Sequence, residues 1–218
     1  TTIRDAYSGL CCGIPNQHKD KDVCYRALKY FVGVVWKTNP HFTVKSDADK
    51  AITGAVHDLG WHADSSVANA WPHNSTHERF HGVLEMSCRA CMLQSGFPMK
   101  AWDHVVLYAA QALNFTKKAP ILDWEKNSDG SIKEASKKKE TQTCWEAHFG
   151  KKWDGPIEPF GRLCYYLEPK TPNSSSESRH PLAPTTKPGL FVGWRLDFGM
   201  IFRGCLLYTS PSPRDVEE

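Results

Sequence analysis

Two carboxylates follow a short β pattern at residues 42–46, in the stretch FTVKSDADKAI. Asp47 lies where that strand is expected to end, and Asp49 comes just before an amphipathic helix. In open α/β sheets, functional groups gather at the carboxyl ends of strands. Mg²⁺ prefers oxygen ligands and commonly takes one or two carboxylates together with phosphate oxygens. With a second acid such as Glu78 on a nearby helix, Asp47 would suit a metal site acting on phosphodiesters.

Both positions also have purely structural explanations. An Asp just before a helix is a good N-cap, and Asp47 or Asp49 could have that role alone. Ser75 and Glu78 fit the capping-box pattern, in which each side chain satisfies a backbone donor of the other residue. On spacing alone, the capping role is the preferred explanation for Glu78.

A possible zinc set spans the middle of the chain. His57, His62, Cys88 and Cys91 follow the pattern His-x4-His-x25-Cys-x2-Cys, and two Cys with two His suit zinc. The two cysteines, however, share a helix face with apolar residues, where buried Cys behaves as a small hydrophobic side chain. We favour the structural role and keep a zinc-stabilised binding module as the alternative.

The composition indicates a folded protein. The 218 residues are 40% hydrophobic and 23% charged, which suits one domain with a smaller appendage. The net charge of +3 does not by itself indicate nucleic-acid binding, and the lysine pairs and triplets are typical of solvated surfaces. No apolar run approaches the roughly 20 residues of a membrane span, and no signal-peptide pattern is present. Eight scattered cysteines favour an intracellular chain with reduced thiols.

Strand and helix patterns alternate along the first half of the chain, which predicts an α/β fold with a parallel or mixed sheet. The expected elements are a strand within residues 3–14, a helix over 20–35 that begins at Asp20 or Asp22, a strand over 42–45, a helix over 51–59 stopped by Gly60, a strand over 61–67, a helix from Ser75 to just before Gly96, and a helix with Trp102 and Leu113 on its apolar side.

The second half of the chain differs from the first in composition and in the elements that it predicts. Residues 119–150 are polar and rich in lysine and are expected to form a linker, and residues 151–204 are expected to form a small β-rich extension. The stretch CLLYTSPSPRD resembles the translated end of an adapter used to prepare sequencing libraries. We therefore expect residues 205–218 to be a non-native tail.

Several motifs occur in an order that resembles the catalytic core of copia-type retrotransposon integrases. They are KSDADKAI, LGW, PHNSTHERFHGVLEM, MLQSGFPMKAW and ALN, and with the later EPFGRLCYY and KPGLFVGW the resemblance covers most of residues 1–204. That family is ribonuclease H-like and carries an Asp-Asp-Glu metal triad. Ser46-Asp47 matches the motif of its second Asp, and Asn74, Glu78 and Arg79 match the motif of its Glu. The separation of 31 residues between the two acids suits a metal pair.

The resemblance implies a ribonuclease H-like mixed sheet flanked by helices over residues 1–118, and metal-dependent DNA strand transfer as the parent activity. Asp47 and Glu78 would hold Mg²⁺ or Mn²⁺. DNA would be the partner, the parent integrase would form a homo-oligomer, no membrane would be involved, and the nucleus would be the expected location. The residues expected to support the site or contact DNA are Asn74, Arg79, Lys45, Lys50 and Lys100.

The chain also departs from the family pattern. Ala48-Asp49 stands where Asn-Gly is usual, and Ser75 replaces a Gly. The opening TTIRDAYSG resembles the second strand of the family, so the first strand and its catalytic Asp are expected to be missing. We therefore expect an integrase fragment that is inactive alone. The alternative is a degenerate nucleic-acid-binding remnant without catalysis.

Overall fold

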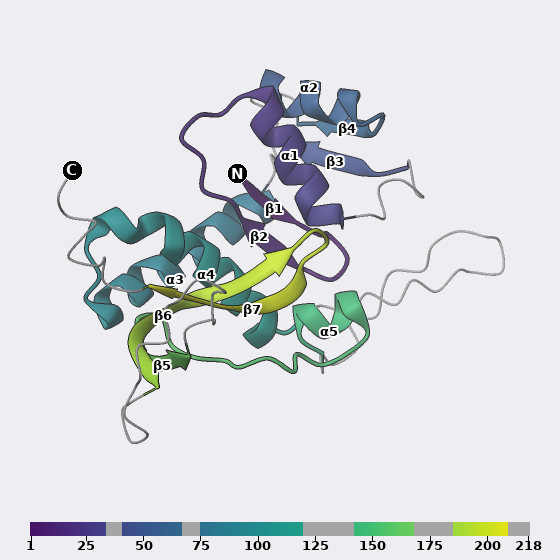
Figure 1. Cartoon of the computed structure of the whole chain (residues 1–218). Coiled ribbons are helices and arrows are strands. Elements are labelled where there is room, and N and C mark those ends of the chain that lie inside the picture. The colour runs from purple at the N-terminus through teal and green to yellow at the C-terminus, as the bar shows by residue number, and fades with distance from the viewer. Residues whose placement is uncertain (34–40, 67–74, 120–141, 168–184, 209–218) are drawn as a thin grey trace, which may run out of the picture.

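The computed structural model describes residues 1–33, 41–66, 75–119, 142–167 and 185–208, which form a mixed α/β protein with three small sheets (Figure 1). The α/β class predicted from the sequence is confirmed. Within the described ranges, no helix combines the length and the apolar character needed to cross a membrane. The strands are β1 (Thr2–Arg4), β2 (Cys11–Gly13), β3 (Thr43–Ser46), β4 (His62–Ser65), β5 (Leu163–Leu167), β6 (Thr186–Asp197) and β7 (Ile201–Tyr208). The helices are α1 (Lys21–Val32), α2 (Lys50–Asp58), α3 (Ser75–Ser95), the 3₁₀ turn η2 (Met99–Ala101), α4 (Trp102–Thr116) and α5 (Cys144–Phe149).

The first two strands form a hairpin, whereas the sequence predicted a single strand over residues 3–14. β1 pairs antiparallel with β2. Between them, Asp5 accepts hydrogen bonds from the Ser8 backbone N–H at 2.8 Å and from the Ser8 hydroxyl at 2.5 Å. Gly9 then adopts a φ of 75°. The prediction was wrong because a turn closed by an Asp side chain, followed by a left-handed glycine, reverses the chain.

The same turn is attached to α5. The Nδ1 atom of His148 lies 3.3 Å from Ser8 Oγ and 3.7 Å from Asp5 Oδ2. Burial acts to raise the pKa of Asp5, but hydrogen bonds from His148 and Ser8 outweigh it and hold that pKa well below its usual range. A capping box between Thr143 and Glu146 begins α5. The stretch expected to be a linker, residues 119–150, therefore ends in a docked helix, while residues 120–141 lie outside the described part of the chain.

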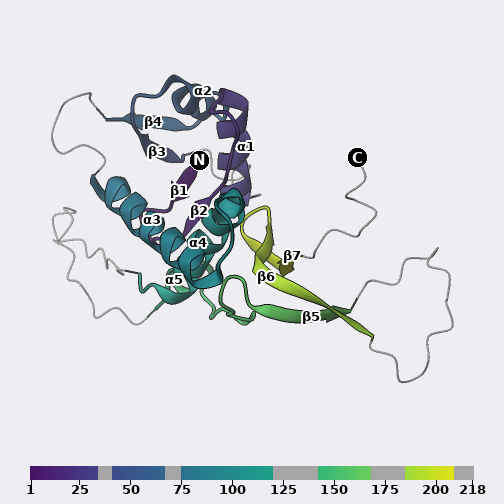
Figure 2. The same ribbon diagram turned by 90° about the vertical axis from the view of Figure 1, so that its left-hand side faces the viewer.

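β3 and β4 form a parallel pair that α2 connects, with Ser46 opposite Ser65. Asp20 caps α1 by accepting a hydrogen bond from the Val23 N–H at 2.7 Å, so it is the start signal among the two that were predicted. Buried side chains from α1, α2 and the start of β4 form one core, made of Cys24, Leu28, Ala55, Val56 and Trp61. This packing fixes the carboxyl end of β3 beside the first turn of α2. Figure 2 shows α1 and α3 on opposite sides of the β1–β2 hairpin.

α4 packs against α3, α5, β2 and β6. Its Asn114 is fully buried and holds both backbone polar groups of Cys11: Oδ1 accepts from the N–H at 2.8 Å, and Nδ2 donates to the carbonyl at 2.7 Å. Trp102 was expected on the apolar side but is 50% exposed. The reason is that it opens the helix, ahead of the buried residues, which begin at Val105.

The C-terminal strands form an antiparallel sheet with β6 in the centre. Trp194 of β6 stacks on Tyr108 of α4, with ring centroids 5.2 Å apart and planes 12° from parallel. Trp194 also meets Phe115 of α4 edge to face at 4.9 Å. The expected β-rich extension over 151–204 thus shares a core with α4. β7 continues through Tyr208, so the boundary predicted at residue 205 falls inside a strand.

Candidate functional site

The two acids that follow β3 have different surroundings. Asp49 accepts hydrogen bonds from the backbone N–H groups of Ala51 at 2.9 Å and Ile52 at 3.3 Å, which makes it the N-cap of α2. It also forms an ion pair with Lys19 at 2.7 Å. The hydrogen bond from Lys19 is the largest cause that lowers the pKa of Asp49. Asp49 is therefore the N-cap of α2, a role that the sequence alone could not assign to Asp47 or Asp49.

The side chain of Asp47, by contrast, does not cap α2. Its backbone carbonyl accepts from the Asp49 N–H at 2.7 Å and from the Ser46 hydroxyl at 3.0 Å, which fixes the turn after β3. Its side chain is exposed, and its carboxylate makes no hydrogen bond or ion pair with any other residue that the structure describes. An exposed carboxylate on a fixed turn is suited to binding a cation from solvent.

Glu78 lies in the first turn of α3 and is exposed, as is the neighbouring Arg79. The charge of Asp47 acts on His77, the residue before Glu78. Burial and then His81 lower the pKa of His77, and Asp47 acts in the opposite direction. The turn after β3 is therefore within electrostatic range of the first turn of α3. Among the described residues, Asp47 and Glu78 belong to no group of three or more potential metal ligands.

The remaining predicted residues vary in position. Asn74 lies outside the described residues, as do the side-chain surroundings of Ser75 that would test its capping box with Glu78. Lys45 is exposed on β3, opposite Asp64 of β4 in the strand register. Lys50 begins α2 and is exposed. It lines an open hollow of about 510 Å³ together with Ala48, Thr53, Gly54, His57 and Ser65.

The four residues of the alternative zinc set have different surroundings. His57 is exposed on α2 and His62 is exposed at the start of β4, whereas Cys88 and Cys91 are partly buried on α3 against the main aromatic core. Burial raises the pKa of Cys88 to about 11 and also raises that of Cys91, which disfavours the thiolate form that binds metal. Among the described residues, no group of three or more His, Cys, Asp or Glu side chains is arranged to hold a metal ion. The packing of Cys88 and Cys91 against the core agrees with the structural role that the sequence favoured for them.

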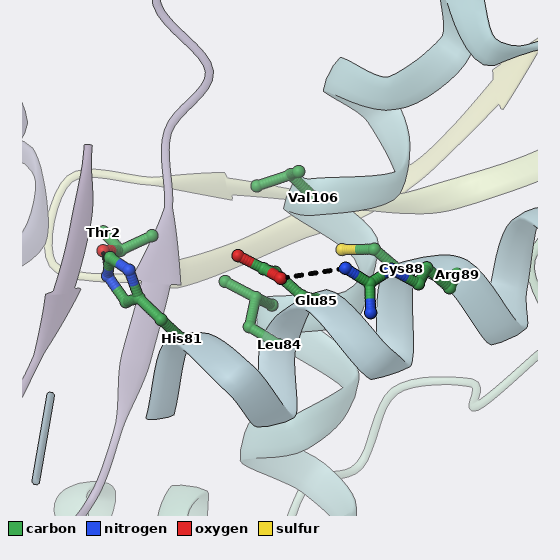
Figure 3. A pocket seen from close by; sticks show the side chains of 7 residues that line it. All are labelled: Thr2, His81, Leu84, Glu85, Cys88, Arg89 and Val106. Carbon is green, nitrogen blue, oxygen red and sulfur yellow. Dashed lines mark hydrogen bonds and ion pairs between the residues drawn. The ribbon is translucent and has the colours of Figure 1, made fainter. Parts of the chain in front are cut away.

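The sequence interpretation missed a pair of histidines on α3. His77 and His81 lie one turn apart, with their Nε2 atoms 3.1 Å from each other. Thr2 of β1 lies against the same two atoms, at 3.3 Å and 2.5 Å. Figure 3 shows His81 beside Thr2 at one end of a hollow of about 330 Å³, with Glu85 turned toward Arg89. The spacing His-x3-His on a predicted helix was the signal that could have identified this pair.

The fold and the site together define a mixed α/β protein with an exposed acidic turn beside a helix start. No protein-family model matches the chain, and no curated protein matches it. One solved structure with a similar backbone is the cryoEM structure of the simian T-cell lymphotropic virus intasome in complex with the PP2A regulatory subunit B56 gamma, at 14% identity and a TM-score of 0.43. The alignment covers 97% of this chain and 72% of that chain. A likeness this distant identifies neither a family nor an activity.

Proposed function

We propose that this chain is an integrase-related, DNA-binding protein in which Asp47 and Glu78 share a Mg²⁺ or Mn²⁺ ion. The observation that carries the proposal is that the two carboxylates after β3 differ in their hydrogen bonds and ion pairs. Asp49 is used as a cap and in an ion pair, whereas the Asp47 carboxylate pairs with no other described residue and its charge reaches the residue before Glu78.

The donor set fits a hard divalent cation. Both side chains offer carboxylate oxygens and both are exposed, so water and phosphate oxygens can reach them as further ligands. A bound Mg²⁺ supplies Lewis-acid polarisation of a phosphate oxygen. The proposal concerns binding rather than turnover, because within the described residues no third acid is grouped with these two.

The element order supports a ribonuclease H-like arrangement as part of this proposal. A hairpin is followed by α1, by the parallel pair β3–β4 that α2 connects, and then by the long helix α3. The copia-type motifs fall on these elements in a consistent way, with Ser46-Asp47 at the carboxyl end of β3 and Glu78-Arg79 in the first turn of α3. A homo-oligomeric parent protein belongs to the same proposal.

The basic side chains near Asp47 suit DNA phosphates. Lys45 and Lys50 flank the acidic turn and are exposed, and Lys50 lines the open hollow beside α2 together with His57. Arg79 is exposed next to Glu78. Contacts of this kind orient DNA without reading its sequence, so we expect binding to duplex DNA with little sequence preference.

A Mn²⁺ titration followed by water proton relaxation tests the metal site. Asp47→Asn and Glu78→Gln should each weaken binding at least about tenfold, because each removes one of two charged ligands. The matched controls are Asp64→Asn on β4 and Glu85→Gln on α3, which should stay within about twofold of the unmodified chain. Equal affinity in the Asp47→Asn variant and the unmodified chain would refute the shared site.

Fluorescence anisotropy with a short DNA duplex tests the DNA surface. Lys50→Gln should weaken binding and reduce the salt-dependence slope by about one, the loss of one phosphate contact. Lys152→Gln, an exposed lysine after α5, is the control and should leave the slope unchanged. Tight DNA binding that Mn²⁺ and Asp47→Asn both leave unaltered would favour the alternative of a non-catalytic nucleic-acid-binding remnant.

A further inference from the structure

His77, His81 and Thr2 bring three polar atoms to one point between α3 and β1. The two Nε2 atoms are 3.1 Å apart, and the Thr2 hydroxyl oxygen is 2.5 Å from that of His81 and 3.3 Å from that of His77. The ring centroids are 4.5 Å apart with planes at 56°. The helix itself causes the pairing, because side chains four residues apart lie on the same face.

Hydrogen bonds among the protein groups alone cannot satisfy all three contacts. Each neutral Nε2 carries either one proton or one lone pair, and the Thr2 hydroxyl has a single proton to donate. A bond from His77 to His81 uses the only lone pair on His81 Nε2 and leaves no Nε2 to accept from Thr2. A chain from one imidazole through the hydroxyl to the other leaves the two Nε2 atoms close but unbonded. A cation that takes both imidazole lone pairs accounts for the close approach of the two Nε2 atoms, and the Thr2 hydroxyl oxygen then faces the cation instead of bonding to a ring nitrogen.

The spacing of the two nitrogens matches a shared metal ion. With Zn–N bonds of about 2.0–2.1 Å, a separation of 3.1 Å corresponds to an N–metal–N angle of roughly 100°, between the octahedral and tetrahedral values. Imidazole suits Zn²⁺, Ni²⁺ and Cu²⁺ rather than Mg²⁺. His81 is exposed and lines the hollow in Figure 3, so solvent can reach the pair and complete the coordination.

The electrostatics of the pair point the same way. The Asp47 carboxylate attracts a cation at this position, and the Arg4 guanidinium, whose charge also acts on His77, opposes it. Glu85, one further turn along α3, forms an ion pair with Arg89 at 3.1 Å (Figure 3).

We propose that His77 and His81 form a binding site for a borderline transition-metal ion, Zn²⁺, Ni²⁺ or Cu²⁺, with the Thr2 hydroxyl beside it. The ion connects the first turns of α3 to β1 through these side chains. The site uses different ligands from the Asp47–Glu78 proposal and a different class of metal, and it does not rest on that proposal.

Ni²⁺ titration of the untagged chain by isothermal calorimetry tests the site. The unmodified chain should bind one equivalent, and His77→Ala and His81→Ala should each weaken binding at least tenfold. His62→Ala, an exposed histidine on β4, is the matched control and should remain within twofold. The milder variants His77→Asn and His81→Asn give the same readout if an alanine variant fails to fold.

Two further measurements make the outcome specific. Cu²⁺ bound to the unmodified chain should give electron paramagnetic resonance spectra with hyperfine coupling to two imidazole nitrogens, reduced to one in either variant. Asp47→Asn should weaken Mn²⁺ binding at least tenfold while Ni²⁺ binding persists, which separates this site from the carboxylate site. Absence of saturable Ni²⁺ binding, or Ni²⁺ binding that survives both His77→Ala and His81→Ala, would overturn the proposal.

Discussion

Asn114 holds the outer edge of β2 in place of a neighbouring strand. Its amide accepts from the Cys11 N–H at 2.8 Å and donates to the Cys11 carbonyl at 2.7 Å, and the side chain is fully buried. Asn114→Leu has a similar volume but makes neither bond. It therefore leaves one buried backbone donor and one buried backbone acceptor unsatisfied.

The expected cost follows from these two groups. Each unsatisfied buried group costs about 1–3 kcal/mol, so Asn114→Leu should lower the free energy of unfolding by roughly 4 kcal/mol. For a chain of this length, about 1 kcal/mol corresponds to roughly 2–4 °C, so the Tm should fall by about 10 °C. Urea and thermal unfolding followed by circular dichroism measure both quantities.

The matched control is Asn16→Leu. Asn16 donates to Thr1 Oγ1 at 2.9 Å and to the Ile14 carbonyl at 3.1 Å, but it is only partly buried, so water can replace it. Its loss should cost less than about 1 kcal/mol. If Asn114→Leu destabilises the protein no more than Asn16→Leu does, the amide does not clamp β2 to α4 and the reasoning is refuted.

Two other predictions concern pH and backbone geometry. Because the pKa of Asp5 is lowered in the folded protein, its contribution to stability is fully present above an unfolded-state pKa near 4 and is lost as the pH falls further. Asp5→Asn should therefore flatten the decline in stability between about pH 4 and pH 2. An unchanged profile in an acid unfolding series would count against this prediction. Gly33→Ala should destabilise the protein by more than about 2 kcal/mol, because the φ of Gly33 is 67° and a Cβ at this position would lie 2.6 Å from Gly199 Cα. At Gly82, inside α3, an added Cβ meets nothing within 4 Å, so Gly82→Ala should stabilise the protein by up to about 1 kcal/mol. Urea unfolding of both glycine variants checks the contrast, and equal effects would contradict it.

Most helices could be predicted because their signals are local. Asp20 and Asp49 each precede an apolar stripe at helical spacing, and the structure has both as N-caps. The predicted helix from Ser75 to just before Gly96 matches α3, which ends at Ser95 next to a glycine with a φ of 68°. Caps and left-handed glycines act within one turn of the chain, so the sequence contains the whole signal.

The missed features depend on contacts between distant residues or on very short motifs. α5 has only six residues, and its capping box at Thr143 and Glu146 follows a lysine-rich stretch that suggested a linker. Trp194 stacks on Tyr108 from 86 positions away, so no local pattern predicts that the C-terminal sheet joins the core of α4. At the candidate site, sequence spacing alone made both Asp47 and Asp49 possible helix caps or metal ligands. Only the observed hydrogen bonds of Asp49 distinguish the two residues.

An experimental structure with Mn²⁺ tests the central proposal most directly. Crystals of this chain soaked in Mn²⁺ should give an anomalous difference peak between the carboxylates of Asp47 and Glu78, and Asp47→Asn crystals should lack it. A well-diffracting crystal with no Mn²⁺ between these two side chains at saturating concentration, or with the carboxylates on opposite faces, would contradict the account.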